Sequence, residues 1–124
     1  MKASSLGFRA AVLFLAAGMA WGMQMAISHD HSAYPAHAHL NLLGWVSLFL
    51  IGLYYRLHPV LERARLAFVQ IWLWIVGVVV QAIGVALVTT GQETAEPAAA
   101  IGSILVVVSM LMFAWLLFRT ERAA

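Results

Sequence analysis

Four apolar stretches without any Asp, Glu, Lys or Arg dominate the chain. They run from Ala10 to His29, from His31 to Tyr55, from Leu66 to Gln92 and from Pro97 to Phe118. A membrane-spanning helix needs about 20 mainly apolar residues, and each stretch is long enough to supply one. Because backbone polar groups in lipid must be satisfied within their own segment, the pattern predicts helices over 8–27, 36–56, 66–89 and 98–118. The predicted fold is all-α, a four-helix transmembrane bundle forming a single membrane domain over residues 1–124.

The composition agrees with a protein surrounded by membrane lipid. Hydrophobic residues make up 64% of the chain, charged residues 10%, and the mean hydropathy is +0.91. A soluble domain carries about 25% charged residues, so the soluble globular class is excluded. Lys2 and Arg9 ahead of the apolar run resemble the start of a secretory signal, but no clean small-x-small cleavage site follows. We therefore expect an uncleaved first helix.

The charged residues between the apolar stretches predict how the bundle is oriented. All seven basic residues fall on one side of the predicted membrane, and the opposite side holds Asp30, Glu93 and Glu96. Short loops rich in Lys and Arg stay in the cytoplasm. We therefore expect both termini to be cytoplasmic and the chain to be a multi-pass protein of the inner membrane. The loop that contains His29 and His31 would then face outward.

Two other counts exclude classes of partner and cofactor. The net charge of +2 and the pI of about 9.5 reflect this topology, and no dense basic cluster indicates nucleic-acid binding. The chain has no cysteine, which excludes disulfides, thiolate zinc sites and iron–sulfur clusters.

Small and polar residues inside the helices predict contacts between them. Gly18-x-x-x-Gly22 in the first helix is typical of close helix packing. Gln70 and Gln81 lie at membrane depth in the third helix, so we expect their amides to face the bundle. Trp72 and Trp74 are most simply explained as part of the cytoplasmic aromatic belt.

Candidate chemistry is concentrated before and at the start of the second helix. Four of the five histidines lie within residues 29–39, namely His29, His31, His37 and His39. An ionisable or strongly polar residue inside a membrane is costly and by default suggests a functional site. Pro35 suits the first turn of a helix, which places His37 and His39 at the outer end of the predicted span.

The helical repeat separates these two imidazoles. At 3.6 residues per turn, His37, Asn41 and Gly44 share one face, whereas His39 points roughly 200° away. One regular helix therefore cannot chelate a single ion with both rings, although the rings can address two different neighbours. Gly44 would leave a flat surface below His37 where a planar ligand could lie.

Three interpretations of the four histidines stay open on residue types alone. Imidazoles are tolerable in a polar outer loop and need no ligand. His29, His31, His37 and His39, with Asp30 nearby, also suit a copper or zinc site. A histidine one turn inside the outer surface, over a small residue, suits an axial ligand of a b-type haem.

The run from Pro35 to Trp45, PAHAHLNLLGW, resembles the start of a haem-bearing helix in subunit I of the haem–copper oxidases and nitric oxide reductases. In that family the second transmembrane helix opens on the outer side with a haem-ligating histidine, which His37 matches. Ala38 matches the small residue after it, and Leu40-Asn41 a pair found in some members. The resemblance implies haem b bound by His37.

The family also has twelve core helices in three groups of four, and this chain resembles one such group. His37-Ala38-His39 resembles a His-x-His of the third group, whose members face two haems, which implies His39 as a second or trans ligand. The resemblance further suggests a homo-oligomer, a dimer or a closed trimer that would rebuild twelve helices. The family's copper-ligand histidines and cross-linked tyrosine have no counterpart here.

These observations lead to one expected function and two alternatives. We expect a haem b-binding membrane protein that transfers electrons or senses a diatomic gas, with His37, His39, Asn41 and Gly44 at the cofactor. The alternatives are a copper-handling protein and a structural subunit without a cofactor. No intramembrane nucleophile or carboxylate pair suggests hydrolytic or group-transfer chemistry.

Overall fold

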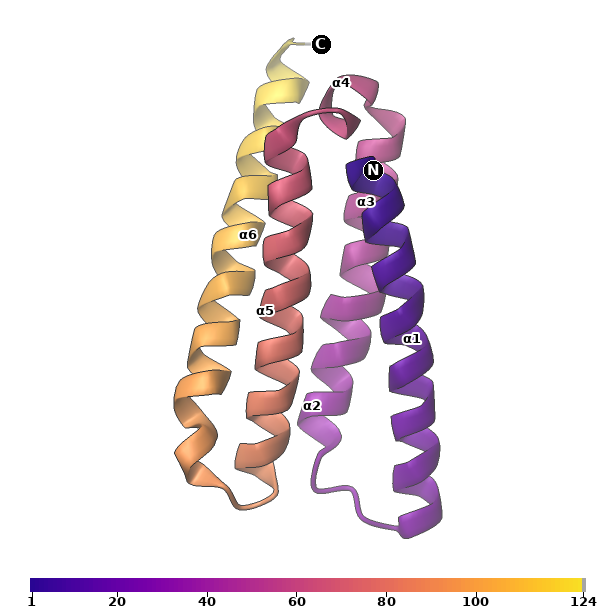
Figure 1. Cartoon of the computed structure of the whole chain (residues 1–124), viewed down its shortest axis with the longest axis vertical. Helices are drawn as coiled ribbons and strands as arrows, with labels where there is room; N and C mark the ends of the chain where they lie inside the picture. Colours follow the sequence, from indigo (N-terminus) through magenta and orange to yellow (C-terminus); the bar gives the residue numbers. More distant parts are fainter. Residues whose placement is uncertain (124) are drawn as a thin grey trace.

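The structure is a computed structural model that describes residues 1–123, and this part of the chain is helical without strands (Figure 1). Its elements are α1 (Ala3–Ser28), α2 (Tyr34–His39), the π-helix η1 (Leu40–Ser47), α3 (Leu48–Leu57), α4 (Pro59–Glu62), α5 (Arg65–Thr89), the 3₁₀ turn η2 (Glu93–Ala95) and α6 (Glu96–Ala123). α2, η1 and α3 follow one another without a break, and Tyr34–Leu57 is called helix 2 below. Four helices are long and apolar enough to cross a membrane, which confirms the predicted all-α fold with four candidate spans.

The helix bounds differ from the predicted ones mainly at the two ends of the chain. α1 begins at Ala3 instead of residue 8, and α6 covers Glu96–Ala123 instead of 98–118. The prediction counted only residues that fit the hydrocarbon layer. Helical hydrogen bonding continues beyond that layer into polar residues, so the real helices are longer.

The two ends of the bundle carry different residues. Figure 1 shows the N-terminus, α4 and the end of α6 together at one end, and the loops after α1 and α5 at the other. We call the first the basic end, because it carries Lys2, Arg56, Arg63, Arg65, Arg119 and Arg122. We call the second the histidine end, because the loop between α1 and helix 2 contains His29 and His31. The partition of basic residues expected from the sequence is therefore present in the folded chain.

Close backbone packing joins α5 to α6. A Cβ added to Gly84 would overlap the backbone of Ala99, and one added to Gly102 would overlap the backbone of Gln81. Only glycine lets two helix backbones approach this closely, and dispersion contacts between them replace the missing hydrophobic driving force within lipid. Two hairpins result, α1 with helix 2 and α5 with α6, and α5 lies between helix 2 and α6 (Figure 1).

A buried polar network connects helix 2, α5 and α6. The Tyr55 hydroxyl donates to Gln70 Oε1 at 2.9 Å, and Gln70 Nε2 donates to Ser109 Oγ at 3.0 Å. Ser109 Oγ in turn donates to the Gln70 backbone carbonyl at 2.8 Å. The expectation that Gln70 faces the bundle is confirmed, since its side chain is fully buried.

Enlarging Gly102 should weaken the α5–α6 pair. We expect Gly102→Val to destabilise the folded protein by about 1–3 kcal/mol, because the new side chain must displace the backbone of α5. Thermal unfolding in detergent measures this loss. Ala100→Val, at an exposed position on α6, is the matched control and should leave the midpoint unchanged. Equal midpoints for the two variants would contradict the close approach.

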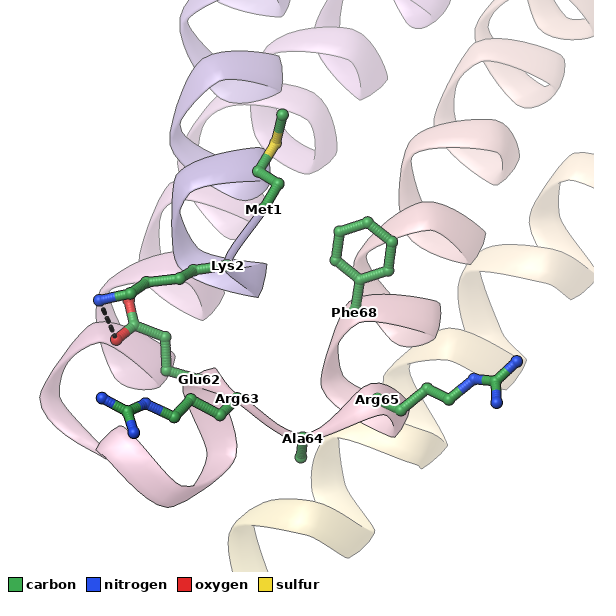
Figure 2. Close-up of a pocket in the computed structure, with 7 residues that line it drawn as sticks. All are labelled: Met1, Lys2, Glu62, Arg63, Ala64, Arg65 and Phe68. Carbon is green, nitrogen blue, oxygen red and sulfur yellow. Dashed lines mark ion pairs between the residues drawn. The ribbon is translucent and has the colours of Figure 1, made fainter.

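A buried carboxylate ties the N-terminus to α4 at the basic end. Glu62 is only 6% exposed, accepts a hydrogen bond from the Ser4 hydroxyl and pairs with Arg56 at 3.1 Å and Lys2 at 3.6 Å. Figure 2 shows Lys2 beside Glu62 on one flank of a pocket of about 500 Å³, with Arg65 pointing away on the other. This cluster fixes the first residues of α1 against the turn that precedes α5.

The same cluster makes part of the stability depend on pH. The Ser4 hydrogen bond, and then the cations Lys2 and Arg56, hold the pKa of Glu62 below its usual value of 4.5, although burial acts in the opposite direction. A depressed folded-state pKa stabilises the fold at pH values above the unfolded-state pKa, and this contribution disappears as the pH falls through the folded-state pKa. We therefore expect thermal stability to fall as the pH drops below about 4.5, and to fall less in Glu62→Gln. Glu93→Gln, at an exposed position of the histidine end, should retain the full pH dependence.

Candidate functional site

The outer turns of helix 2 direct its two imidazoles to opposite neighbours. The His37 ring lies edge-on to Trp21 of α1, with ring centroids 6.4 Å apart. His39 instead lines a groove that helix 2 forms with α5 and α6. This confirms the prediction that the two rings cannot chelate one ion and address different sides of the bundle.

The side chains of His37 and Asn41 pack against two glycines of α1, Gly22 and Gly18. A Cβ on Gly22 would lie 3.1 Å from Cε1 of His37, and a Cβ on Gly18 would overlap the Asn41 amide. Asn41 Nδ2 lies 3.1 Å from Nε2 of His37 and 3.4 Å from Nδ1. Gly18-x-x-x-Gly22 therefore does more than bring two helices together, because it makes room for a polar pair. The amide nitrogen therefore lies within hydrogen-bond distance of both ring nitrogens.

The flat surface expected at Gly44 is covered within the chain. A Cβ on Gly44 would lie 2.8 Å from Cγ of Phe14, so the ring of this α1 residue packs directly on the glycine. The aromatic ring takes the space that the sequence left for a planar ligand. Sequence reasoning missed Phe14 because the facing residue of another helix cannot be read from the pattern of helix 2.

One ring nitrogen of His39 makes a hydrogen bond within the chain, and the other does not. Its Nδ1 lies 2.6 Å from the backbone carbonyl of Pro35. A carbonyl can only accept, so in the neutral ring Nδ1 carries the proton and Nε2 has the lone pair. Metal-ligating histidines are commonly oriented in this way by a backbone carbonyl. His58 makes the same bond to the Tyr54 carbonyl at 2.7 Å, but its ring stacks on the Tyr54 ring at the basic end.

The groove beside His39 has the size and lining of a ligand site. Its volume is about 430 Å³, within the usual range for small-molecule pockets. Leu42 and Val107 are exposed, so the groove opens sideways toward the surroundings of the bundle. The lining residues are Ala38, His39, Leu42 and Leu43 from helix 2, Gln81 from α5, and Ser103, Val106 and Val107 from α6. Three polar side chains therefore face an otherwise apolar space.

Gln81 contributes a buried acceptor without a partner. The residue is 7% exposed, and its Nε2 donates to Ser103 Oγ at 2.9 Å. Ser103 Oγ donates onward to the Ala99 carbonyl at 2.8 Å. Gln81 Oε1 has no hydrogen bond, and among the buried side chains of residues 1–123 it is the only such atom. An unsatisfied buried acceptor costs about 1–3 kcal/mol.

A π-helix directly follows the two histidines. η1 covers Leu40–Ser47, where the sequence predicted a regular α-helix, and π segments are frequent at functional sites. Side chains satisfy carbonyls of this wider turn: Ser47 Oγ donates to the Leu42 carbonyl at 2.8 Å, and Trp74 Nε1 to the Leu43 carbonyl at 2.9 Å. Trp74 is 3% exposed, so its assignment to the aromatic belt was wrong. The indole instead fixes helix 2 to α5.

The loop histidines do not converge with those of helix 2. His29 ends α1 with a positive φ of 57°, and both His29 and His31 are exposed. Asp30 Oδ1 accepts hydrogen bonds from Ser32 N and Oγ, and these bonds lower the pKa of its carboxyl group. Across residues 1–123, no three His, Asp or Glu side chains form a group that could hold a metal ion. The copper site with His29, His31, His37 and His39 stays a prediction.

Comparisons of this chain with models of known protein families, with curated proteins and with solved structures found no match. The resemblance of residues 35–45 to oxidase subunit I therefore stays an interpretation of that motif. The description of the groove and its polar groups depends on the structure alone.

The contact between Gly18 and the Asn41 side chain can be tested by a double-mutant cycle. Gly18→Ala should lower the unfolding midpoint in detergent, because its methyl group displaces the Asn41 amide and breaks the bond to His37. In an Asn41→Ala background the same methyl group meets no amide, so it should cost less by about 0.5–3 kcal/mol, the usual coupling between contacting residues. Ala16→Val, at an exposed position of α1, serves as the control. Additive losses of stability in the double mutant would show that Gly18 does not make room for the Asn41 side chain.

Proposed function

We propose that this chain is a haem b-binding integral membrane protein similar to one four-helix unit of haem–copper oxidase subunit I. It would accept an electron or bind a diatomic gas at iron held near the histidine end. Four candidate spans and a histidine pair at the outer turns of helix 2 support this proposal. Fold-level similarity alone does not imply function, so the proposal depends on the site itself.

The observation that carries the proposal is the state of His39. Its Nδ1 proton is held by the Pro35 carbonyl, and its ring lines an apolar groove. Neutral imidazole with a free nitrogen is the form that ligates haem iron. His39 would hold the iron of the cofactor, and the aliphatic side chains of the groove would contact its apolar part. When bound, haem supplies a redox-active iron.

We propose that His39, instead of His37, would hold the iron. His37 is enclosed by Gly22, Trp21 and Asn41, and its Nε2 lies 3.1 Å from the Asn41 amide nitrogen. We therefore propose that His37 and Asn41 act by positioning: they anchor the outer turns of helix 2 on α1. His39 is then presented on the opposite side at a fixed depth, while Leu43 and Val106 keep water away from it.

We further propose that the basic end faces the cytoplasm and that the histidine end faces the outer side of the inner membrane. The support is the positive-inside rule applied to the basic end. A homo-oligomer also belongs to this proposal. The groove opens sideways, and a second or third copy of the chain in a closed ring would cover it.

Substitution of the axial ligand gives the decisive test. Purified protein supplied with haem should show a Soret band that shifts on reduction by dithionite. We expect His39→Ala to lose this band almost completely and His37→Ala to retain it at lower thermal stability. His58→Ala, which removes the histidine with the same backbone bond at the basic end, is the matched control and should retain it.

Two results would contradict the proposal in different ways. Loss of the band in His37→Ala together with retention in His39→Ala would return the ligand role to His37. Wild-type protein that takes up no haem would refute haem binding altogether.

A further inference from the structure

A second groove, which we call the α6 groove, follows α6 inward from the basic end. Its first part, of about 530 Å³, lies between α4, the start of α5 and the last turns of α6. Its inner part, of about 310 Å³, continues along α6, and Leu66 and Trp115 line both parts. We infer that the α6 groove binds one anionic phospholipid, with the phosphate at Arg119 and an acyl chain along α6. Lipid binding here requires no haem, so it goes beyond the proposed function and is independent of it.

The length of the α6 groove matches one leaflet of a bilayer. It extends from Arg119 to Val108, which lie eleven residues apart in α6. At 1.5 Å per residue this is about 16 Å along the helix, close to half of a hydrocarbon core about 30 Å thick. Leu116 is buried at the base of the groove, whereas Leu66 and Leu111 are exposed, so the groove opens to the surrounding lipid. An acyl chain of one leaflet can therefore lie along it.

Arg119 is held where the phosphate of such a lipid would lie. Its guanidinium carbon is 5.2 Å from the centroid of the Trp115 ring, which is within the range of a cation–π contact. Tryptophan is typical of the membrane interface, so this contact keeps the guanidinium at the depth of the headgroups. The fork of N–H donors on a guanidinium matches the oxygens of a phosphate. Thr120 also lines the groove, but its hydroxyl donates to the Leu116 carbonyl at 2.9 Å.

No carboxylate competes with a phosphate in the α6 groove. Its lining contains no Asp or Glu, and Arg119 is its one charged side chain. The two carboxylates of the basic end are engaged elsewhere: Glu62 in the cluster with the N-terminus, and Glu121 by a tyrosine hydroxyl at 2.9 Å. Arg65, which directly precedes Leu66 of the lining, adds a second positive charge nearby. Basic pockets between membrane helices bind anionic headgroups, and this one has the apolar continuation that a lipid needs.

Native mass spectrometry with two lipids of identical acyl chains tests the headgroup contact. Dioleoylphosphatidylglycerol is anionic and dioleoylphosphatidylcholine is zwitterionic, and titration of each into detergent-purified protein gives its dissociation constant. We expect wild-type protein to prefer phosphatidylglycerol, and Arg119→Gln to reduce this preference about fivefold, the effect of one basic residue at an anionic surface. Arg122→Gln, at an exposed position of α6 outside the groove, is the matched control and should keep the preference. Arg119→Lys retains the charge and should keep more of it than Arg119→Gln.

A second pair of variants tests the acyl chain. Leu111→Trp places a larger ring in the inner part of the groove, so it should weaken the binding of both lipids. Ile104→Trp makes a similar change at an exposed position of α6 outside the groove and should bind both as the wild type does. Glycerol phosphate carries the anionic group without acyl chains, and it should not displace phosphatidylglycerol from wild-type protein. This competition needs no variant, so it decides the matter even if a substitution prevents folding.

Three results would overturn the lipid site, and none of them depends on haem. Equal binding of the two lipids by wild-type protein, or equal losses of preference in Arg119→Gln and Arg122→Gln, would exclude Arg119 as the headgroup contact. Displacement of the lipid by glycerol phosphate would make this a site for a free phosphate ester. Dimers without lipid that dissociate in Leu111→Trp would show that a second copy of the chain covers the groove.

Discussion

Hydrocarbon offers no hydrogen-bond partners, so each polar side chain inside this bundle must find one within the chain. Gln70 meets this requirement through Tyr55 and Ser109, and Trp74 through the Leu43 carbonyl. These contacts determine which faces of helix 2, α5 and α6 meet. The one buried side-chain oxygen that fails the requirement within residues 1–123 is Gln81 Oε1, and it lies in the groove beside His39.

Glycine is used in two different ways in the same bundle. On α5 and α6, Gly84 and Gly102 bring backbone against backbone. On α1, Gly18 and Gly22 instead leave room for the side chains of Asn41 and His37. The second use gives a reason for two polar residues on the α1 side of helix 2. They pack against α1, while His39 on the opposite face lines the groove with α5 and α6.

The sequence was sufficient for the four spans, the division of charges between the two ends and the opposite faces of His37 and His39. Each of these depends on composition or on helical repeat, which are local properties of the chain. The role of Phe14 over Gly44, the π-helix after His39 and the burial of Trp74 were not predictable in this way. They depend on which residue of a neighbouring helix lies opposite. The unpaired state of Gln81 belongs to the same class, because it requires knowing that Ser103 takes its amide nitrogen but leaves its oxygen.

The arrangement of the two hairpins also bears on how the protein matures. α1 with helix 2 and α5 with α6 are each held by their own glycine contacts, whereas the groove exists only where the two hairpins meet. During biosynthesis the first hairpin leaves the ribosome before the second, and neither alone contains both His39 and Gln81. A ligand of this groove could therefore bind only after the two hairpins have docked in the bilayer.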